Sequence, residues 1–198
     1  GRNPHLLGGV QAEIVNNVVY DWGYAGTEIE PLRGQSRVDI IGNHYIPGAT
    51  SYPQPRGITV FGPSNGARMF VRDNLGPKRT TGSEPQWALV QLDRVRLSDI
   101  RAARRVSGGS GLVPQPVATV SGSVLPVVGA TVPVRDSIDA RIVASVTDRT
   151  GGLIDAPKDV GGYVSFAPAT PPPDSDHDGM PNAWEDDRGL DRTDPSDT

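Results

Sequence analysis

The feature that most constrains the fold is a weak internal repeat in the first third of the chain. Residues 13–20, 39–46 and 69–76 each hold a short β-branched or aromatic run, then Asn, then a turn. The Asn residues are Asn17, Asn43 and Asn74. Repeats of this period indicate a solenoid, because one coil cannot bury its inner face alone and its neighbours must cover it. We predict that the runs stack as parallel strands and that the Asn side chains form a hydrogen-bonded ladder.

A β-sandwich with Asn at its turns is the alternative, and the shared Asn position after each run favours the solenoid. Abundant Gly (24) and Pro (19) fit short strands and turns. The predicted fold class is all-β: a partial parallel β-helix of about three coils, an extended C-terminal wrap, one short helix and a calcium-binding loop. The expected divisions are residues 1–106 for the coils, 107–170 for a segment and helix packing on them, and 171–198 for a Pro spacer and acidic loop.

Later segments are less regular. Residues 87–97 alternate enough to form one more strand. Nearby arginines are most simply a solvated face, with a polyanion-binding groove as an alternative that their spacing does not support: Arg94, Arg96, Arg101, Arg104 and Arg105. Residues 107–134 lack a helical period and are predicted to be extended. Residues 136–146 form the one convincing helix, which Asp136 can cap and which is expected to cover a solenoid face.

Near the C-terminus, residues 174–185 have the spacing of a calcium-binding loop. The expected ligands, at loop positions 1, 3, 5, 7, 9 and 12, are Asp174, Asp176, Asp178, Met180, Asn182 and Glu185. Met180 offers its backbone carbonyl, and Asn182 binds directly or through water. Gly179 permits the sharp turn at position 6. A solvated acidic tail is the alternative, but a random acidic run would not keep this register. A second acidic string, Asp191, Asp194 and Asp197, could open another metal loop.

The charge of the chain is uneven. Residues 174–198 hold nine Asp and Glu against two Arg, whereas the rest holds 17 Lys and Arg against 14 acids. This small positive excess gives no indication of nucleic acid binding. The absence of cysteine excludes disulfides and thiolate metal sites. Because calcium is plentiful outside cells, we expect a secreted or extracellular protein, with the periplasm or cell surface as alternatives, and a monomer without a membrane span.

Two stretches resemble a known family. Arg2-Asn-Pro4-His-Leu-Leu-Gly-Gly9 and Ala12-Glu-Ile-Val-Asn-Asn17-Val-Val-Tyr20 resemble the Arg-x-Pro-x-x-Arg stretch and the following Asn-Asn-x-x-Tyr coil of pectate lyases, polysaccharide lyase family 1. Later segments, including the C-terminal loop, look like those of one bacterial subgroup of this family. The C-terminal loop also resembles EF-hand and thrombospondin type 3 loops. The resemblance covers most of the chain, and the order of the motifs is more specific than any one of them.

The resemblance implies a right-handed parallel β-helix that cleaves polygalacturonate by calcium-assisted β-elimination, with Arg2 removing the C5 proton. Guanidinium is protonated at ordinary pH, so this role requires nearby cations and burial that depress its pKa. The family's second arginine falls at Leu7, which shifts a substrate carboxylate contact to another residue such as Arg33. His5, in the same loop, can contact sugar, although an exposed loop histidine is the simpler reading.

The family's active-site calcium carboxylates and its lysine lie upstream of Arg2. The chain has no initiator Met and opens within a motif, which suggests an incomplete chain, so residues 1–198 alone are expected to be inactive. The alternative to a lyase is a non-catalytic, calcium-stabilised extracellular β-helix that only binds polysaccharide. A glycosidase using Glu28, Glu30 or Asp21 stays open, but nothing in their spacing singles them out.

Overall fold

The computed structural model describes residues 3–52, 56–132, 134–165 and 168–197. They fall into two compact units, residues 1–163 and residues 164–198. Within the described ranges, every helix is too short or too polar to cross a bilayer.

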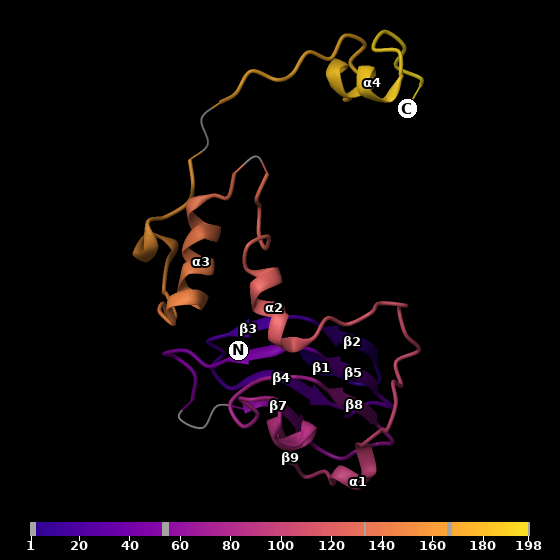
Figure 1. The fold of residues 1–198 in the computed structure, drawn as a ribbon, viewed down its shortest axis with the longest axis vertical. Helices are drawn as coiled ribbons and strands as arrows, with labels where there is room; N and C mark the ends of the chain where they lie inside the picture. Colours follow the sequence, from indigo (N-terminus) through magenta and orange to yellow (C-terminus); the bar gives the residue numbers. More distant parts are fainter. Residues whose placement is uncertain (1–2, 53–55, 133, 166–167, 198) are drawn as a thin grey trace. The chain divides into compact units, whose positions relative to one another are not determined.

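The first unit is built from three parallel sheets (Figure 1). The first sheet has the order β1 (His5–Leu7), β4 (Ala25–Glu30), β7 (Arg56–Phe61) and β9 (Val90–Asp93). The second has the order β2 (Gln11–Val15), β5 (Arg37–Ile41) and β8 (Arg68–Arg72). The third pairs β3 (Val18–Tyr20) with β6 (His44–Ile46). The chain visits the three sheets in turn and then returns to the first, so each circuit lies on the previous one.

The predicted stacking of the three repeats is confirmed. Residues of the second sheet pair in parallel, with Ile14 beside Ile40 and Ile40 beside Val71. A parallel ladder with this register excludes the antiparallel pairs of a β-sandwich for these strands. The all-β parallel class predicted from the repeat is therefore correct.

Each circuit bends between the second and third sheets at a residue with positive φ. These residues are Asn16 (φ 54°), Gly42 (φ 68°) and Asp73 (φ 52°), each directly before a ladder Asn. Glycine, Asn and Asp are the residues that tolerate this left-handed conformation. Gly42 is required for space as well, because a Cβ there would lie 2.4 Å from Nδ2 of Asn16. The turn chemistry therefore fixes the position of each ladder Asn, directly after the bend.

The Asn ladder is confirmed. Asn17 Nδ2 donates to Asn43 Oδ1 at 2.9 Å, and Asn43 Nδ2 donates to Asn74 Oδ1 at 2.9 Å. Asn43 and Asn74 are fully buried, and their amides also donate to backbone carbonyls, including Ile14 O and Ile40 O. Buried amides are tolerated because these bonds satisfy them.

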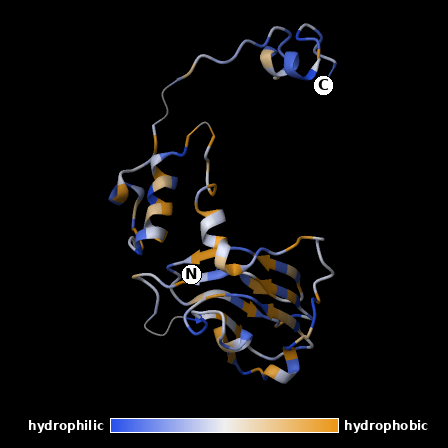
Figure 2. Ribbon diagram, in the orientation of Figure 1, coloured by the Kyte–Doolittle hydropathy of each residue, from blue (hydrophilic) through white to orange (hydrophobic). Residues whose placement is uncertain are grey.

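Apolar side chains fill the interior between the sheets, and Figure 2 shows that hydrophobic residues recur along the strands. In the first sheet, Ile29 and Val60 are paired in register and fully buried. Burying one such side chain stabilises the fold by roughly 1.5–3 kcal/mol. Trp22 meets Tyr45 edge to face at 6.1 Å, and both rings are buried. The core therefore requires the stacked circuits, because each supplies one layer of it.

The segment after the coils differs from its prediction. Residues 87–97 contribute only the short strand β9, between a 3-10 helix at Gln86–Leu89 and α1 (Leu97–Ile100). Residues 107–134 are not extended throughout, because they contain α2 (Val117–Val124). This helix has weak intrinsic propensity, and two tertiary features stabilise it. Val117 and Val120 are buried, and the Asp73 carboxylate accepts the Val117 N–H at 2.9 Å.

The predicted helix is α3 (Ser137–Asp148), and its cap is confirmed, since Asp136 accepts the Asp139 N–H at 2.8 Å. The Asp139 carboxylate does not complete a capping box and instead accepts the Ala130 N–H at 2.7 Å. Val146 is the one buried residue of this helix, and Ile142 is 48% exposed. The burial pattern therefore does not support the expectation that this helix covers a solenoid face. A further 3-10 helix, Pro157–Val160, follows α3.

The second unit contains the acidic loop and α4 (Asn182–Arg188), which ends at Gly189 in the left-handed conformation with φ 74°. Pro181 precedes the first helical residue, and Gly189 provides the C-terminal cap, a position where glycine is favoured. The exposed Trp184 ring lies 3.9 Å from the Arg188 guanidinium carbon.

Candidate functional site

The start of the first sheet holds His5, one of the residues predicted to contact substrate. Arg2 lies outside the described residues, and the next residue, Asn3, is hydrogen-bonded to the neighbouring circuit. Asn3 N donates to Gly26 O at 2.6 Å, and Thr27 Oγ1 donates to Asn3 O at 3.2 Å. Parallel pairing of β1 with β4 then places His5 beside Glu28.

The His5 side chain lies between two carboxylates. Its Nε2 is 3.0 Å from Glu30 Oε1 and 3.7 Å from Glu28 Oε1. Because carboxylates accept hydrogen bonds, Nε2 is the donor to Glu30 and Nδ1 stays available to another partner. Glu28 is only 2% exposed, and both glutamates have further interactions. Spacing did not reveal this grouping, because it arises from the pairing of two strands.

Arg33 is exposed and lies just beyond the end of β4. Its Cβ is 3.8 Å from the position that a Cβ would occupy at Gly8, which follows β1. His5 and Arg33 therefore lie along the same strand pair, with His5 at the start of β1 and Arg33 beyond its end.

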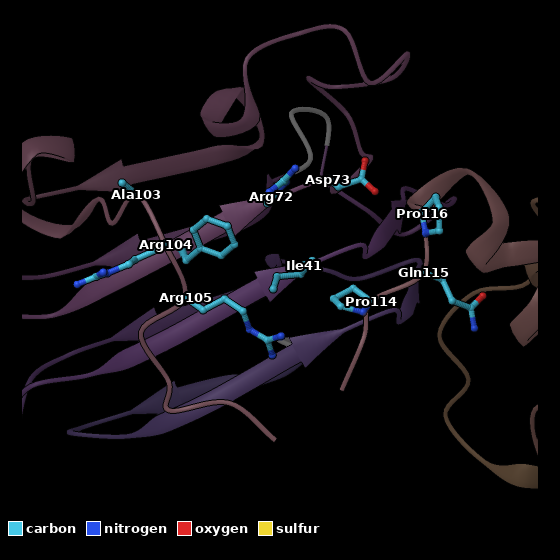
Figure 3. A pocket seen from close by; sticks show the side chains of 10 residues that line it. Ile41, Arg72, Asp73, Ala103, Arg104, Arg105, Pro114, Gln115 and Pro116 are labelled. Atoms are coloured by element: carbon cyan, nitrogen blue, oxygen red, sulfur yellow. The ribbon is translucent and has the colours of Figure 1, made fainter. Parts of the chain in front are cut away.

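A pocket of about 690 Å³ lies over the second sheet, between its strands and the segment that returns across them (Figure 3). Its lining includes Ile41, Phe70 and three arginines: Arg72, Arg104 and Arg105. In Figure 3, Arg104 and Arg105 extend to different sides of the crossing segment. The sequence did not predict this pocket, because its walls come from segments far apart in the chain.

Arg105 is not part of a solvated face, so that prediction is wrong for this residue. Its guanidinium binds the Glu13 carboxylate and lies 3.4 Å from Asp39 Oδ2. Asp39 is fully buried and also accepts the Val106 N–H at 2.8 Å. Hydrogen bonds from Ser110, and then from Arg105 and other neighbours, lower the pKa of Glu13 to about 2. These contacts fix the crossing segment on the second sheet.

His44 does not lie among metal ligands. It is half-buried in β6, and its Nδ1 is 2.8 Å from Ser121 Oγ of α2. Burial, together with the positive charge of Arg149, lowers its pKa.

In the second unit, the first three predicted loop carboxylates converge. Asp174, Asp176 and Asp178 each offer an oxygen within 4.8 Å of the others. Asp174 Oδ2 accepts the Gly179 N–H at 3.1 Å, and Asp178 Oδ1 accepts the Met180 N–H at 2.7 Å. Gly179 has φ 95°, which is the sharp turn expected at this position. The loop backbone is thus curled around these carboxylates.

Glu185, in α4, is completely buried, and neither of its carboxylate oxygens has a hydrogen-bond partner among the described residues. Oδ2 of Asp176 and Oδ2 of Asp178 are also buried without a partner in the part of the chain that the structure describes. Burial raises the pKa of Glu185, and the neighbouring negative charges of Asp176 and Asp178 raise it further. Burial also raises the pKa of Asp176. Inward-facing oxygens of this kind need protons or a cation.

The side chain of Asn182, the predicted ligand at the ninth loop position, does not join the carboxylate cluster. The Asn182 side chain faces Ser175, accepting its N–H at 2.8 Å and donating to its Oγ at 2.8 Å. Asp197, from the tail beyond α4, forms a carboxylate cluster with Asp178 and Glu185 within 4.8 Å. Sequence reasoning noted Asp197 only as part of a separate acidic string.

The fold defines a class of protein, a stack of parallel β-coils. In this chain an acidic loop whose carboxylates could hold a metal ion follows the coils in the sequence. No family model matches the chain, and no solved structure matches it. Three curated relatives, each named probable pectate lyase C, match nearly all of it. The Aspergillus flavus protein is 30% identical over 205 residues, covering 96% of this chain and 44% of that protein. The Aspergillus fumigatus protein is 31% identical over 202 residues, with the same coverages.

The third relative, from Emericella nidulans, is 29% identical over 194 residues, covering 96% of this chain and 43% of its own length. Over nearly its whole length, including the motifs around Asn17, the chain is similar to these proteins named pectate lyase. The chain spans less than half the length of the curated relatives that it matches.

Proposed function

We propose that the protein carrying this chain cleaves polygalacturonate, or a related acidic polysaccharide, by β-elimination. Three features support the proposal: the likeness to pectate lyases over 96% of the chain, the Arg2 motif and the stacked parallel circuits. On this proposal the three sheets are part of a right-handed parallel β-helix, and the protein acts as a secreted monomer on polysaccharide outside the cell.

In the proposed reaction, Arg2 removes the C5 proton of a uronide. The electron pair of that C–H bond forms the C4–C5 double bond. The bond from C4 to the glycosidic oxygen breaks, and the departing sugar keeps this oxygen and its electron pair and takes a proton from water. His5 and Arg33 are the proposed substrate contacts, with Arg33 binding a sugar carboxylate. Glu28 and Glu30 beside His5 would repel an anionic sugar, so a positive charge is needed there.

A calcium ion bound at the site would supply positive charge that offsets the substrate carboxylate and makes the C5 proton more acidic. Among the described residues, His5, Glu28 and Glu30 each offer a ligand atom within 4.8 Å of the others. Ca²⁺ takes oxygen ligands rather than an imidazole nitrogen, so this group is not proposed as the catalytic calcium site.

The C-terminal loop is different, and we propose that it binds Ca²⁺ in a structural role. Asp174, Asp176, Asp178, the Met180 carbonyl and Glu185 would supply hard oxygen ligands. The side chain of Asn182, at the ninth loop position, is instead hydrogen-bonded to Ser175. The observation that supports this is Glu185, whose two buried oxygens lack partners among the described residues.

The lyase proposal is tested by replacing Arg2. In the protein that carries this chain, Arg2→Ala should lower the rate of unsaturated uronide release from polygalacturonate by about 100-fold or more, the scale of a lost general base. Arg96→Ala is the matched control, because Arg96 is an arginine with an 84% exposed side chain. Both variants should melt as the wild type does. Equal turnover in the wild type and Arg2→Ala would reject Arg2 as the base.

The alternative is a non-catalytic, calcium-stabilised protein that binds polysaccharide. The arginine-containing pocket over the second sheet is its structural basis, because it joins an apolar floor to cationic walls. This alternative predicts polygalacturonate binding without any turnover, and Arg72→Ala would weaken that binding.

A further inference from the structure

We propose that Asp197, in the tail beyond α4, is a direct ligand of the cation bound by the C-terminal loop. This inference rests on the calcium site proposed above and adds a ligand that the loop spacing does not contain. It also means that one cation joins the loop to the chain's last turn.

The first argument is position. Carboxylate oxygens of Asp197, Asp178 and Glu185 lie within 4.8 Å of one another, a separation that a single Ca²⁺ can bridge at ordinary ligand distances. Glu185 at the centre of this group is fully buried, and both of its oxygens lack a hydrogen-bond partner among the described residues. A buried carboxylate without donors requires a positive charge, and no Lys or Arg is recorded as pairing with it in the described range.

The second argument is the way in which each carboxylate divides its two oxygens. In Asp176 and Asp178, Oδ1 accepts a backbone N–H of the loop, whereas Oδ2 is buried without a partner in the described chain. Asp197 repeats this arrangement: Oδ2 accepts the Asp191 N–H at 2.5 Å, and Oδ1 is buried without a described partner. One oxygen therefore fixes the backbone and the other faces the cluster, as in the loop ligands.

The third argument is the ninth loop position. The Asn182 side-chain oxygen accepts the Ser175 N–H at 2.8 Å, and its nitrogen donates to Ser175 Oγ. Asn182 is thus used to close the loop on itself. The free oxygen of Asp197 provides the ligand that this position would otherwise supply.

The ligand set that results suits calcium. Asp176, Asp178, Asp197 and Glu185 present five buried carboxylate oxygens without described partners. With Asp174 and the Met180 carbonyl, the set falls within the six to eight oxygens that Ca²⁺ takes, and it contains none of the nitrogen or sulfur ligands that zinc prefers.

The experiment is calorimetric titration of the full 198-residue chain with CaCl₂, comparing the wild type, Asp197→Asn and Asp187→Asn. Asparagine at 197 can still accept the Asp191 N–H, so the tail should keep its fold, but it presents a weaker neutral ligand. Asp187→Asn removes the same charge from an exposed position of α4. We expect calcium affinity to fall at least about tenfold in Asp197→Asn and no more than about threefold in Asp187→Asn.

Hydrogen exchange gives a second readout. In the wild type, calcium should slow exchange of the Asp191 amide, and Asp197→Asn should reduce that protection. Calcium binding by the wild type with equal affinities in the two variants would overturn the role of Asp197 while leaving the loop site intact. A wild type that binds no calcium would overturn both this inference and the proposed loop site, whereas the lyase proposal would still stand on its own assay.

Discussion

Replacing Asn43 by alanine tests the Asn ladder at the point where most of its bonds meet. Asn43 Oδ1 accepts two donors from Asn17, the backbone N–H at 3.0 Å and Nδ2 at 2.9 Å. Its Nδ2 donates to Asn74 Oδ1 and to Ile14 O, the latter at 2.8 Å. The substitution therefore removes bonds that connect three successive circuits.

The magnitude follows from which groups lose their partner. Asn74 Oδ1 still accepts the backbone N–H of residue 43, so it stays satisfied. The Asn17 N–H loses the acceptor described above, whereas the parallel register places the Ile14 carbonyl against the Ile41 N–H, so this carbonyl keeps a donor. At about 1–3 kcal/mol for an unsatisfied buried group, and with the Asn17 amide only partly buried, we expect a loss of about 1–3 kcal/mol.

Urea unfolding followed by circular dichroism measures this loss, with Asn17→Ala as the matched control. Asn17 is exposed at the end of the ladder, and its side chain only donates, to Asn43 and to Val15 O. Its removal should cost less than about 1 kcal/mol. If the two variants differed by less than about 0.5 kcal/mol, the ladder would not carry the stability assigned to it.

Three further predictions concern separate parts of the molecule. Hydrogen bonds from Ser110 and its neighbours lower the pKa of Glu13 from 4.5 to about 2, so ionised Glu13 stabilises the fold above about pH 4.5, and this contribution is lost as the pH falls through 2. Glu13→Gln should therefore be less stable than the wild type in urea at pH 7. A difference in stability between the two proteins that did not narrow towards pH 2 would contradict the assignment. Calcium at millimolar concentration should raise the melting temperature of the C-terminal unit in the wild type and not in Asp176→Ala, whereas equal melting temperatures of the wild type in calcium and in EGTA would count against the site. Gly26→Ala should destabilise by about 1–3 kcal/mol, because its Cβ would lie 2.6 Å from the Tyr45 ring; a variant as stable as the wild type in urea would show that the circuits pack less closely there.

The stacked circuits could be predicted from sequence because the repeat carries its own turn chemistry. Asn16, Gly42 and Asp73 are residues that tolerate positive φ, and each stands just before a ladder Asn. Local sequence and long-range pairing therefore favour the same structure, which is the condition under which patterns are informative. The N-cap at Asp136 was predictable for the same reason.

Features that depend on distant partners could not be predicted. The helix α2 has a Gly- and Val-containing sequence, and it forms where Asp73 accepts the Val117 N–H. Arg105 looked solvated because its partners, Glu13 and Asp39, lie more than 60 residues earlier in the chain. The candidate loop ligands followed from spacing, but the approach of Asp197 depends on how the tail folds back after α4.

Product analysis in water enriched with ¹⁸O tests the central claim most directly. The protein that carries this chain is incubated with polygalacturonate and calcium, and the shortened products are examined by mass spectrometry. Elimination breaks the chain without adding water, so the account predicts products with an unsaturated end and no ¹⁸O gained by cleavage. Products that carry ¹⁸O would indicate hydrolysis, and intact bound polymer would indicate a binding protein, so either result would contradict the assignment as a lyase.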